Sequence, residues 1–293
     1  MEGQRRISRN RLTAPLGTHN ALLSARARTH FVNDFAGPLS IKSVVEGAVA
    51  WKSGGRELVV DRDSFLVLNH GEPYSMAIES RPPVATLCVF FQEGFVESVH
   101  GSLAGDAVDS EPAPARFLGR LHARDSRILP RMQAIAGVSN GAGEPGQLWL
   151  DEQYLELARD LLLLNRDLGQ RMRLMPARRP ATREELFRRV RRGQEILHAD
   201  PANDWGLAEI ARASYLSPYH FQRAFTRAFG KSPHQYRNGL RLARARRLLE
   251  STRMTVTEIC GAVGFESAPS FSTLYRQSFG EPPSATRKLS NSR

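Results

Sequence analysis

Residues 207–237 read LAEIARASYLSPYHFQRAFTRAFGKSPHQYR, and residues 256–287 read VTEICGAVGFESAPSFSTLYRQSFGEPPSATR. Both stretches contain the pattern F-x-x-x-[FY]-x-x-x-F-G, and the second copy lies 50 residues after the first. A short apolar helical pattern precedes each copy, LAEIA in the first and VTEIC in the second. The sequence therefore predicts two copies of one helical unit.

The aromatic residues of the repeat are spaced to form one face of a helix. They are Phe221, Phe225 and Phe229 in the first copy and Phe271, Tyr275 and Phe279 in the second. Gly230 and Gly280 permit a left-handed helix end, and Pro233 and Pro283 prevent continuation. Two helices joined by a short turn form a helix-turn-helix, whose second helix can present its polar face to a DNA major groove. We expect these motifs at 207–229 and 256–279.

The charge of the chain is concentrated in the half that holds the repeat. The formal net charge of the 293 residues is +11. Residues 171–293 contain 23 Lys and Arg against 10 Asp and Glu, whereas the first 170 residues contain 18 against 20. This asymmetry favours a polyanion as partner of the basic half and a small or uncharged partner for the other half. A basic face that serves only solubility is the alternative.

The two cysteines, Cys88 and Cys260, lie in apolar patterns of different predicted domains, so we expect no disulfide and a reducing compartment. The first residues are basic but lack an apolar run of signal-peptide length. Nothing in the sequence approaches the roughly 20 apolar residues that a membrane span needs. We therefore expect a cytoplasmic protein with no membrane partner.

The acidic half is read as short strands separated by turn residues, with the spacing of a small sandwich or barrel. The expected strands are 41–45, 48–51, 57–60, 65–68, 75–78 and 84–91. Two helical stretches follow at about 115–136 and 147–169. The apolar stripe of the second must be covered, either by the β-domain of the same chain or by the same helix of a second subunit.

The second helix of each motif is called its reading helix. The sequence also predicts where the first reading helix begins and which of its side chains face outward. Ser217 is a candidate N-cap and Pro218 occupies the favoured first helical position. With the aromatic residues facing inward, Tyr219, Gln222 and Arg223 face outward. Arg223 could pair with guanine through two hydrogen bonds, Gln222 could do so with adenine, and Tyr219 could contact a thymine methyl.

The two quoted stretches resemble the paired motifs of AraC/XylS-type transcriptional regulators. The resemblance covers about 100 residues and includes Ser217, the G-x-x-P-x-x-Y-R ending at Arg237, and Gly264-Phe265. It implies an α+β multidomain fold: an N-terminal cupin-like β-barrel with flanking helices, and a C-terminal all-α domain with two helix-turn-helix motifs. Combined with the composition and periodicity along the chain, it gives the expected organisation: a flexible basic arm at 1–28, an effector-binding barrel at 29–113, a helical segment that could dimerise at 114–170, a linker at 171–183 and the DNA-binding domain at 184–293.

By this resemblance and by helical position, eleven residues are expected at the DNA. They are Ser217, Tyr219, His220, Gln222, Arg223, Arg227, Ser267, Ala268, Ser270, Thr273 and Arg276. The second unit departs from the family pattern, because Ala268, Pro269, Ser270 and Thr273 stand where basic or amide residues are common, and Thr286 replaces the usual Tyr. We expect weaker direct readout of bases by this unit, with phosphate contacts and DNA shape contributing more.

The acidic half shows no pattern of catalytic or metal-binding residues. The histidines of the predicted barrel are isolated, without an H-x-H pair on any strand, and no nucleophile or phosphate-loop motif occurs. We expect no enzyme activity, metal or cofactor. A small barrel can accept one small molecule, and the expected lining residues are Trp51, Phe65, Tyr74 and Phe90, although each could be plain core.

These features together predict a sequence-specific regulator that binds double-stranded promoter DNA and responds to a small-molecule effector. We expect an activator, because activation is more usual in the family that the chain resembles. The further partners expected are RNA polymerase and a second copy of the chain. Two alternatives stay open. One is a regulator without small ligand, controlled by a protein partner. The other is a metal-dependent cupin enzyme tethered to a DNA-binding module.

Overall fold

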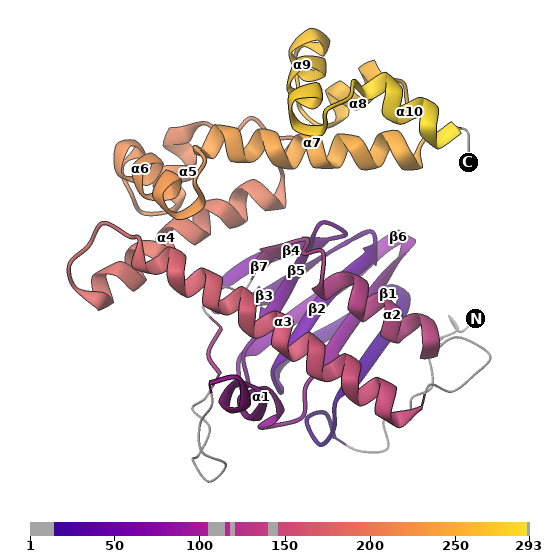
Figure 1. Cartoon of the computed structure of the whole chain (residues 1–293), viewed down its shortest axis with the longest axis vertical. Helices are drawn as coiled ribbons and strands as arrows, with labels where there is room; N and C mark the ends of the chain where they lie inside the picture. Colours follow the sequence, from indigo (N-terminus) through magenta and orange to yellow (C-terminus); the bar gives the residue numbers. More distant parts are fainter. Residues whose placement is uncertain (1–14, 105–114, 118–120, 140–145, 292–293) are drawn as a thin grey trace. The chain divides into compact units, whose positions relative to one another are not determined.

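The computed structural model describes residues 15–104, 115–117, 121–139 and 146–291. The chain divides into two compact units, Met1–Gln170 and Arg171–Arg293, which are the N-terminal unit and the C-terminal unit (Figure 1). The N-terminal unit combines an antiparallel sheet with helices, and the C-terminal unit is helical. The expected α+β multidomain class is therefore confirmed.

Seven strands and three helices make up the described part of the N-terminal unit. The strands are β1 (Ala21–Ala36), β2 (Ser40–Glu46), β3 (Ala48–Ser53), β4 (Arg56–Asp61), β5 (Ser64–Leu68), β6 (Pro73–Phe90) and β7 (Leu121–Ala123). The helices are α1 (Phe95–Ala104), α2 (Ile128–Ser139) and α3 (Gln147–Arg173), the last of which continues three residues past the boundary between the units.

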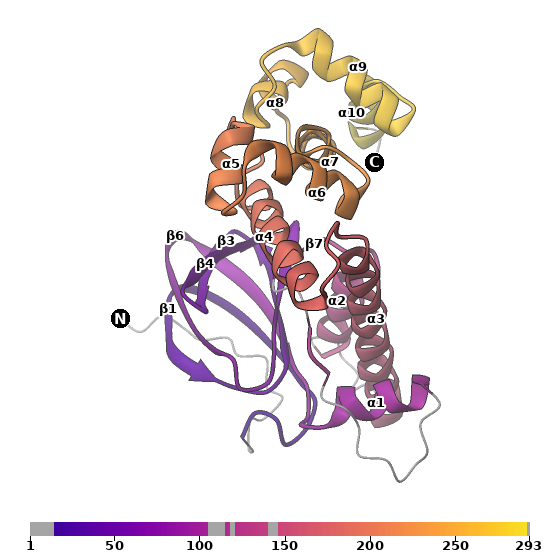
Figure 2. The same ribbon diagram turned by 90° about the vertical axis from the view of Figure 1, so that its left-hand side faces the viewer.

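The strands form one sheet that curls into a near-barrel (Figure 2). The order along the sheet is β4-β3-β6-β2-β5-β7, β1 adds to β6, and every pair is antiparallel. Strand β6 is long enough to pair with β3 near its start, with β2 near its end and with β1 on its other edge. Strongly curved sheets of this kind enclose an interior face and present an exterior face.

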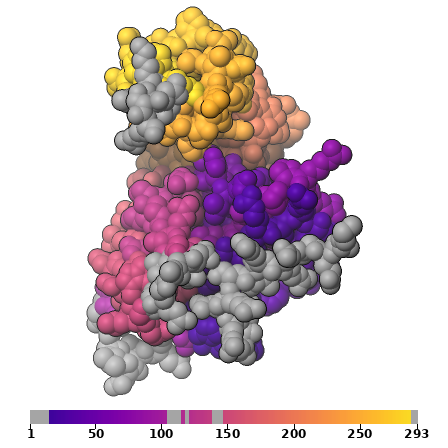
Figure 3. All heavy atoms as spheres, turned by 90° about the vertical axis from the view of Figure 1, so that its right-hand side faces the viewer, coloured from indigo at the N-terminus to yellow at the C-terminus, as the bar shows by residue number. Residues whose placement is uncertain are grey.

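The structure differs from the sequence-based prediction at two strands, β1 and β6. The prediction assigned residues up to 28 to a flexible arm, yet β1 begins at Ala21, and residues 1–14 lie outside the described part. Most side chains of β1 are partly or fully exposed, and its indigo atoms are visible on one face of the unit (Figure 3). A strand that buries so little lacks the alternation by which sequence patterns reveal strands.

The second error concerns β6, which was read as two strands separated by Arg81-Pro82-Pro83. The structure has one strand, and the ladder with β1 is interrupted there, between the pairs Ala27–Val84 and Thr29–Glu79. Proline lacks the backbone N–H that a ladder requires, so it is tolerated where pairing lapses. The dipeptide therefore marks an irregularity inside a strand instead of its end.

Two apolar cores lie on opposite faces of the curled sheet. The exterior core joins the sheet to α2 and α3 and includes Ile41, Phe65, Val67, Val89, Leu157 and Leu161. The interior core lies inside the near-barrel and includes Val44, Trp51, Leu58, Leu66 and Tyr74. Both views show α2 and α3 on the same side of the sheet (Figures 1 and 2).

The helical part of this unit also differs from expectation in one place. The first predicted helix, at about 115–136, contains the short strand β7 paired with β5, and α2 starts only at Ile128. The apolar stripe of α3 is buried against the sheet of the same chain, which answers the question of what covers it. A second subunit is not needed for that purpose.

The described C-terminal unit consists of seven helices after the end of α3. They are α4 (Pro180–Ala199), α5 (Leu207–Ala213), α6 (Pro218–Phe229), α7 (Pro233–Ser251), α8 (Val256–Ala262), α9 (Ala268–Phe279) and α10 (Pro283–Asn291). The predicted motifs at 207–229 and 256–279 coincide with α5–α6 and α8–α9, and α7 connects them (Figure 1). The predicted linker at 171–183 was too long, because α3 ends at Arg173 and α4 starts at Pro180.

Helix α4 packs very closely on the first motif through a residue without a side chain. A Cβ atom added to Gly193 would lie 2.3 Å from the ring of Phe221 and 2.9 Å from the hydroxyl of Ser214. Both of those residues are completely buried. The position of the first reading helix therefore depends on the absence of a methyl group at residue 193.

We predict that Gly193→Ala lowers the free energy of unfolding by roughly 1–3 kcal/mol, because overpacking a filled core forces side chains or backbone to shift. Urea denaturation of the full chain measures this. The control is Gly239→Ala in α7, where an added Cβ meets nothing within 4 Å. That variant should gain about 0.5–1 kcal/mol from helix propensity alone, and equal effects of the two variants would contradict the proposed packing.

Candidate nucleic-acid interface

Both reading helices begin with the same capping arrangement. The Ser217 hydroxyl accepts a hydrogen bond from the backbone N–H of His220 at 3.4 Å, and the Ser267 hydroxyl accepts one from that of Ser270 at 3.5 Å. A proline stands in the first turn of each helix. The caps leave other N–H groups at the start of each helix exposed to solvent, which is where a helix can meet an anion.

The turns between the helices of each motif are also equivalent. Tyr215 has φ 55° and Gly264 has φ 88°, so the chain enters the left-handed region at the same point of both copies. After each of them, a backbone N–H bonds back to the preceding helix, from Leu216 to Ala211 and from Phe265 to Cys260. Tyrosine in this conformation is unusual. Its ring lies 5.0 Å from the guanidinium of Arg192, in cation–π contact.

The aromatic rows predicted from the repeat pack inward. Ring centroids of Phe221 and Phe225 lie 5.4 Å apart, and those of Phe271 and Tyr275 lie 5.7 Å apart. All four of these residues are fully buried. Because one face of each helix is held in the core in this way, the opposite face is directed to solvent.

Ten of the eleven residues expected at the DNA are exposed. They are Ser217, Tyr219, His220, Gln222, Arg223, Arg227, Ser267, Ser270, Thr273 and Arg276. The exception is Ala268, which is half-buried and packs against the core of the second motif. On α6 the Arg223 guanidinium lies 3.4 Å from the Tyr219 hydroxyl, one turn away, so the two side chains share one patch of surface.

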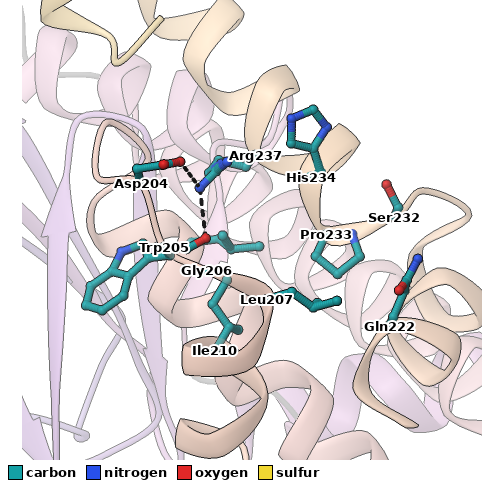
Figure 4. Close-up of a pocket in the computed structure, with 11 residues that line it drawn as sticks. Asp204, Trp205, Gly206, Leu207, Ile210, Gln222, Ser232, Pro233, His234 and Arg237 are labelled. Carbon is teal, nitrogen blue, oxygen red and sulfur yellow. Dashed lines mark hydrogen bonds and ion pairs between the residues drawn. The ribbon is translucent and has the colours of Figure 1, made fainter. Parts of the chain in front are cut away.

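The helix that follows each motif carries an arginine that ties it to the loop before that motif, a role that sequence reasoning missed; Arg237 in α7 is buried and Arg287 in α10 is half-buried. Figure 4 shows Arg237 between the Asp204 carboxylate, at 3.1 Å, and the backbone carbonyl of Trp205, at 3.0 Å. Its counterpart Arg287 donates to the carbonyls of Thr252 and Met254. The matching offset of 50 residues was the signal that could have revealed this role.

A second buried arginine of α7 joins the two motifs. Arg241 donates to the carbonyls of Pro201, Ala202 and Asn203, at distances from 2.6 to 3.1 Å. The backbone of Ala202 in turn lies against Gly264, where an added Cβ would come within 2.3 Å of the Ala202 carbonyl oxygen. The loop after α4 is thus fixed between α7 and the turn of the second motif.

A polar network between α4 and α7, in contact with the first motif through Tyr236, requires a neutral histidine. Arg191 donates to Gln194, Gln194 donates to the Tyr236 hydroxyl at 2.5 Å, and that hydroxyl lies 2.9 Å from Nε2 of His198. Because the Tyr236 hydroxyl oxygen already accepts from Gln194, its proton is donated to His198. Nε2 of the imidazole must therefore be unprotonated in order to accept this hydrogen bond. Burial, followed by the charge of Arg191, lowers the pKa of His198 to about 3, which keeps the ring neutral.

The second motif replaces this network with a smaller one. Thr286 stands where the first copy has Tyr236, and its hydroxyl lies 3.0 Å from the Tyr275 hydroxyl and 2.7 Å from the Glu281 carboxylate. The departure from the repeat therefore leaves a buried hydrogen bond in place. It does not by itself weaken the second unit.

The N-terminal unit contains a cavity of about 240 Å³ inside the near-barrel. Trp51, Tyr74 and Phe90, three of the four residues expected to line an effector site, do line it. The prediction for Phe65 was wrong, because that ring faces the exterior core and stacks on His122 at 5.0 Å. Neighbouring residues of a strand point to opposite faces, and Leu66 is the one that points inward.

Sequence reasoning missed the charged residue of this cavity, Lys42 of β2. It is 1% exposed, and its Nζ atom has no hydrogen-bond partner in the part of the chain that the structure describes. Burial lowers the pKa of Lys42 to about 8. The alternation of side chains along β2 places Lys42 on the face of the sheet opposite to Ile41. It does not show which of the two faces lies inside the near-barrel.

Two further findings bound the chemistry of the chain. Within the described ranges, no three His, Cys, Asp or Glu side chains come together closely enough to hold a metal ion. Among those same residues, no helix has the length and apolar character that crossing a bilayer requires.

Comparison with known proteins gives consistent matches to the helical unit. Residues 210–289 match a helix-turn-helix domain family. The HTH-type transcriptional regulator GbdR from Pseudomonas aeruginosa is 40% identical over 93 residues, which are 32% of this chain. The match spans only 25% of the length of GbdR.

Two other matches differ in extent. The virulence regulon transcriptional activator VirF from Yersinia enterocolitica is 24% identical over 253 residues, covering 83% of this chain and 87% of VirF. A crystal structure of a probable AraC family transcriptional regulator from Rhodopseudomonas palustris is 30% identical, with a TM-score of 0.34. It covers 35% of this chain and 96% of that one.

We predict that the neutral His198 makes the protein sensitive to acid. The pKa of His198 is depressed in the folded state, whereas the unfolded chain takes up this proton below about 6.5. The free energy of unfolding should therefore fall as the pH decreases from 6.5 toward 3, by at most ~1.4 kcal/mol per pH unit for this group.

Urea denaturation between pH 4.5 and 6.5 measures the slope, which should be smaller in His198→Gln. The control is His234→Gln, an exposed histidine of the same unit, for which the slope of the wild type should be retained. An unchanged slope in His198→Gln would contradict the assignment.

Proposed function

We propose that this chain, a member of the AraC/XylS family of DNA-binding transcription regulators, is an activator whose action depends on a small molecule bound in the N-terminal unit. The observation that carries the proposal is the duplicated motif, in which each of two exposed polar helix faces is fixed by an aromatic core of its own. The name of the relative VirF, an activator that matches most of the chain, supports activation.

We propose that α6 reads bases directly. Arg223, Gln222 and Tyr219 are exposed on one helix whose opposite face is buried, which is the arrangement needed to enter a major groove. Arginine pairs best with guanine and glutamine with adenine, in each case through two hydrogen bonds. His220 and Arg227 flank this patch and suit contacts with phosphates, as do the capped starts of both reading helices.

The second reading helix is proposed to contribute less sequence information. On α9 the position of Arg223 is taken by Thr273 and that of His220 by Ser270, both exposed, and Arg276 lies three residues after Thr273. Short hydroxyl side chains can bond to many bases or to phosphates, and so discriminate poorly. Alanine at 268 is half-buried and offers only a methyl group.

Helix α7 sets the separation between the motifs. Its 19 residues extend over ~28 Å at 1.5 Å per residue. Successive major grooves on one face of a duplex are ~34 Å apart. We propose that the two reading helices occupy neighbouring grooves of one promoter site, so that a single chain does what a dimer does in simpler helix-turn-helix proteins.

The N-terminal unit is proposed to hold the effector in the cavity lined by Trp51, Tyr74 and Phe90. Binding there would bias the chain between two arrangements, and thereby alter DNA affinity or contact with RNA polymerase. The cytoplasm is the proposed location. Because the stripe of α3 is already buried, a homodimer would need another surface, such as that around the exposed Leu148 and Leu155.

We predict that Arg223→Ala weakens binding to the natural promoter site by ~1–3 kcal/mol and relaxes preference at one base pair. Genome-wide mapping of bound sites supplies the promoter, and selection of bound sequences from a random pool measures the preference. Arg159→Ala, which removes an exposed helical arginine of the N-terminal unit, is the control and should bind as the wild type does.

A second comparison separates the two reading helices. Ser270→Ala and Thr273→Ala in α9 should each reduce affinity by less than Arg223→Ala and leave the preferred sequence unchanged. If either variant relaxed a base preference as strongly as Arg223→Ala, the proposed inequality of the two motifs would be wrong. If none of the three changed any preference, α6 would lose its assignment as the base-reading helix.

A further inference from the structure

The cavity of the N-terminal unit contains a buried cation, Lys42, which has no counter-charge among the described residues that line the cavity. Lys42 comes from the centre of β2 and lines the cavity with Trp51, Tyr74 and Phe90. Its Nζ atom lies 3.5 Å from the ring centroid of Phe90 and 4.8 Å from that of Tyr74. Within the part of the chain that the structure describes, the residues that line the cavity include no Asp or Glu.

The other polar groups that face the cavity cannot neutralise this charge at neutral pH. Cys88 lies directly opposite Lys42 in the pairing of β2 with β6, and burial raises the pKa of its thiol. Burial likewise raises the pKa of Tyr74. Thr86 is uncharged, and His30, on the exposed side of the cavity, is not an anion in either protonation state.

A lysine in this position is unfavourable for folding alone. Buried charges in proteins are normally paired, and an apolar side chain of similar length would fill the space without a desolvation penalty. Contact with ring faces offsets only part of that penalty. The missing interaction is that of an anion with the ammonium group, and the surrounding walls are apolar.

We propose that the cavity binds an apolar monocarboxylic acid, with its carboxylate paired to Lys42 and its hydrocarbon part against Trp51, Tyr74 and Phe90. This inference rests on the proposed effector role of the N-terminal unit and names the chemical class of that effector. A single cation among aromatic and aliphatic side chains matches a single negative charge, whereas a phosphate dianion would need more donors than the lining supplies. The volume of about 240 Å³ limits the ligand to a small acid.

The test compares acids with alcohols of the same carbon skeleton. The full chain is titrated by calorimetry with hexanoate, octanoate and 3-phenylpropanoate, and with hexan-1-ol, octan-1-ol and 3-phenylpropan-1-ol. At least one acid should bind ten-fold or more tightly than its alcohol. If every acid binds no better than its alcohol, or none binds, the proposal is overturned.

Two variants test whether Lys42 causes the preference for an acid over its alcohol. Lys42→Met should lower the affinity for the acid to that for the alcohol. Lys52→Met should preserve the preference, because the side chain of Lys52 is 71% exposed and belongs to β3, which does not pair with β2. Retention of the acid preference in Lys42→Met would overturn the assignment.

The melting temperature of the ligand-free variants tests the alternative that Lys42 only stabilises the core of the N-terminal unit. Since Met removes a buried charge, Lys42→Met should melt at or above the temperature of the wild type. A lower melting temperature combined with unchanged acid binding would assign Lys42 to the core as a cation held by Phe90 and Tyr74, and would overturn the proposal.

The pH dependence gives an independent readout. Acid affinity should decline as the pH rises beyond the range in which Lys42 is protonated, since a neutral amine no longer pairs with a carboxylate. His30 also lines the cavity, so His30→Gln is the control and should show the same decline. An affinity that stays constant between pH 7 and pH 10 would contradict pairing with Lys42.

DNA binding distinguishes failure of this inference from failure of the proposed function. Fluorescence anisotropy with the mapped promoter site is measured with and without the acid. Binding of DNA by a chain that binds no acid overturns the acid site and leaves the regulator intact. Binding of acid without any change in DNA affinity or transcription supports the acid site and overturns its role as effector.

Discussion

The burial of one aromatic face on each reading helix is the interaction on which the C-terminal unit depends. Phe221, Phe225, Phe271 and Tyr275 are removed from water, and this leaves the polar residues of the same helices no position except the surface. Close approach of α4 at Gly193 fixes the first helix further, since no space remains between the two. Affinity for DNA therefore depends on how the buried face of the helix packs. A change in that packing would alter the direction of the Arg223 side chain even though Arg223 itself is not substituted.

Duplication explains both the symmetry of this unit and its differences. The caps, the left-handed turn residues and the arginines at the end of each motif recur with nearly constant spacing. Exposed positions differ far more, because packing constrains the inward residues of a helix and leaves the outward ones free to suit a partner. The scaffold is thus shared by the two motifs, while the chemistry presented to DNA is proposed to differ between them.

Much of the C-terminal unit could be predicted from sequence, because helical periodicity, Pro at helix starts and Gly at helix ends all act locally. The strand β1 could not, since its side chains are largely exposed and its partner β6 lies about 50 residues away. The cavity was predicted in part: Trp51, Tyr74 and Phe90 were named, but Phe65 was placed on the wrong face and Lys42 was missed. Alternation shows which residues share a face, but only the curvature of the sheet decides which face is inside.

In the proposed complex with DNA, one chain places α6 and α9 in neighbouring major grooves of the same duplex. Hydroxyl-radical footprinting of the full chain on its mapped promoter site tests it most directly, because cleavage reports the protected backbone at single-nucleotide resolution. We expect two protected patches on one face of the DNA, centred about one helical turn, or ~10 base pairs, apart. A single patch, or two patches on opposite faces of the duplex, would contradict it.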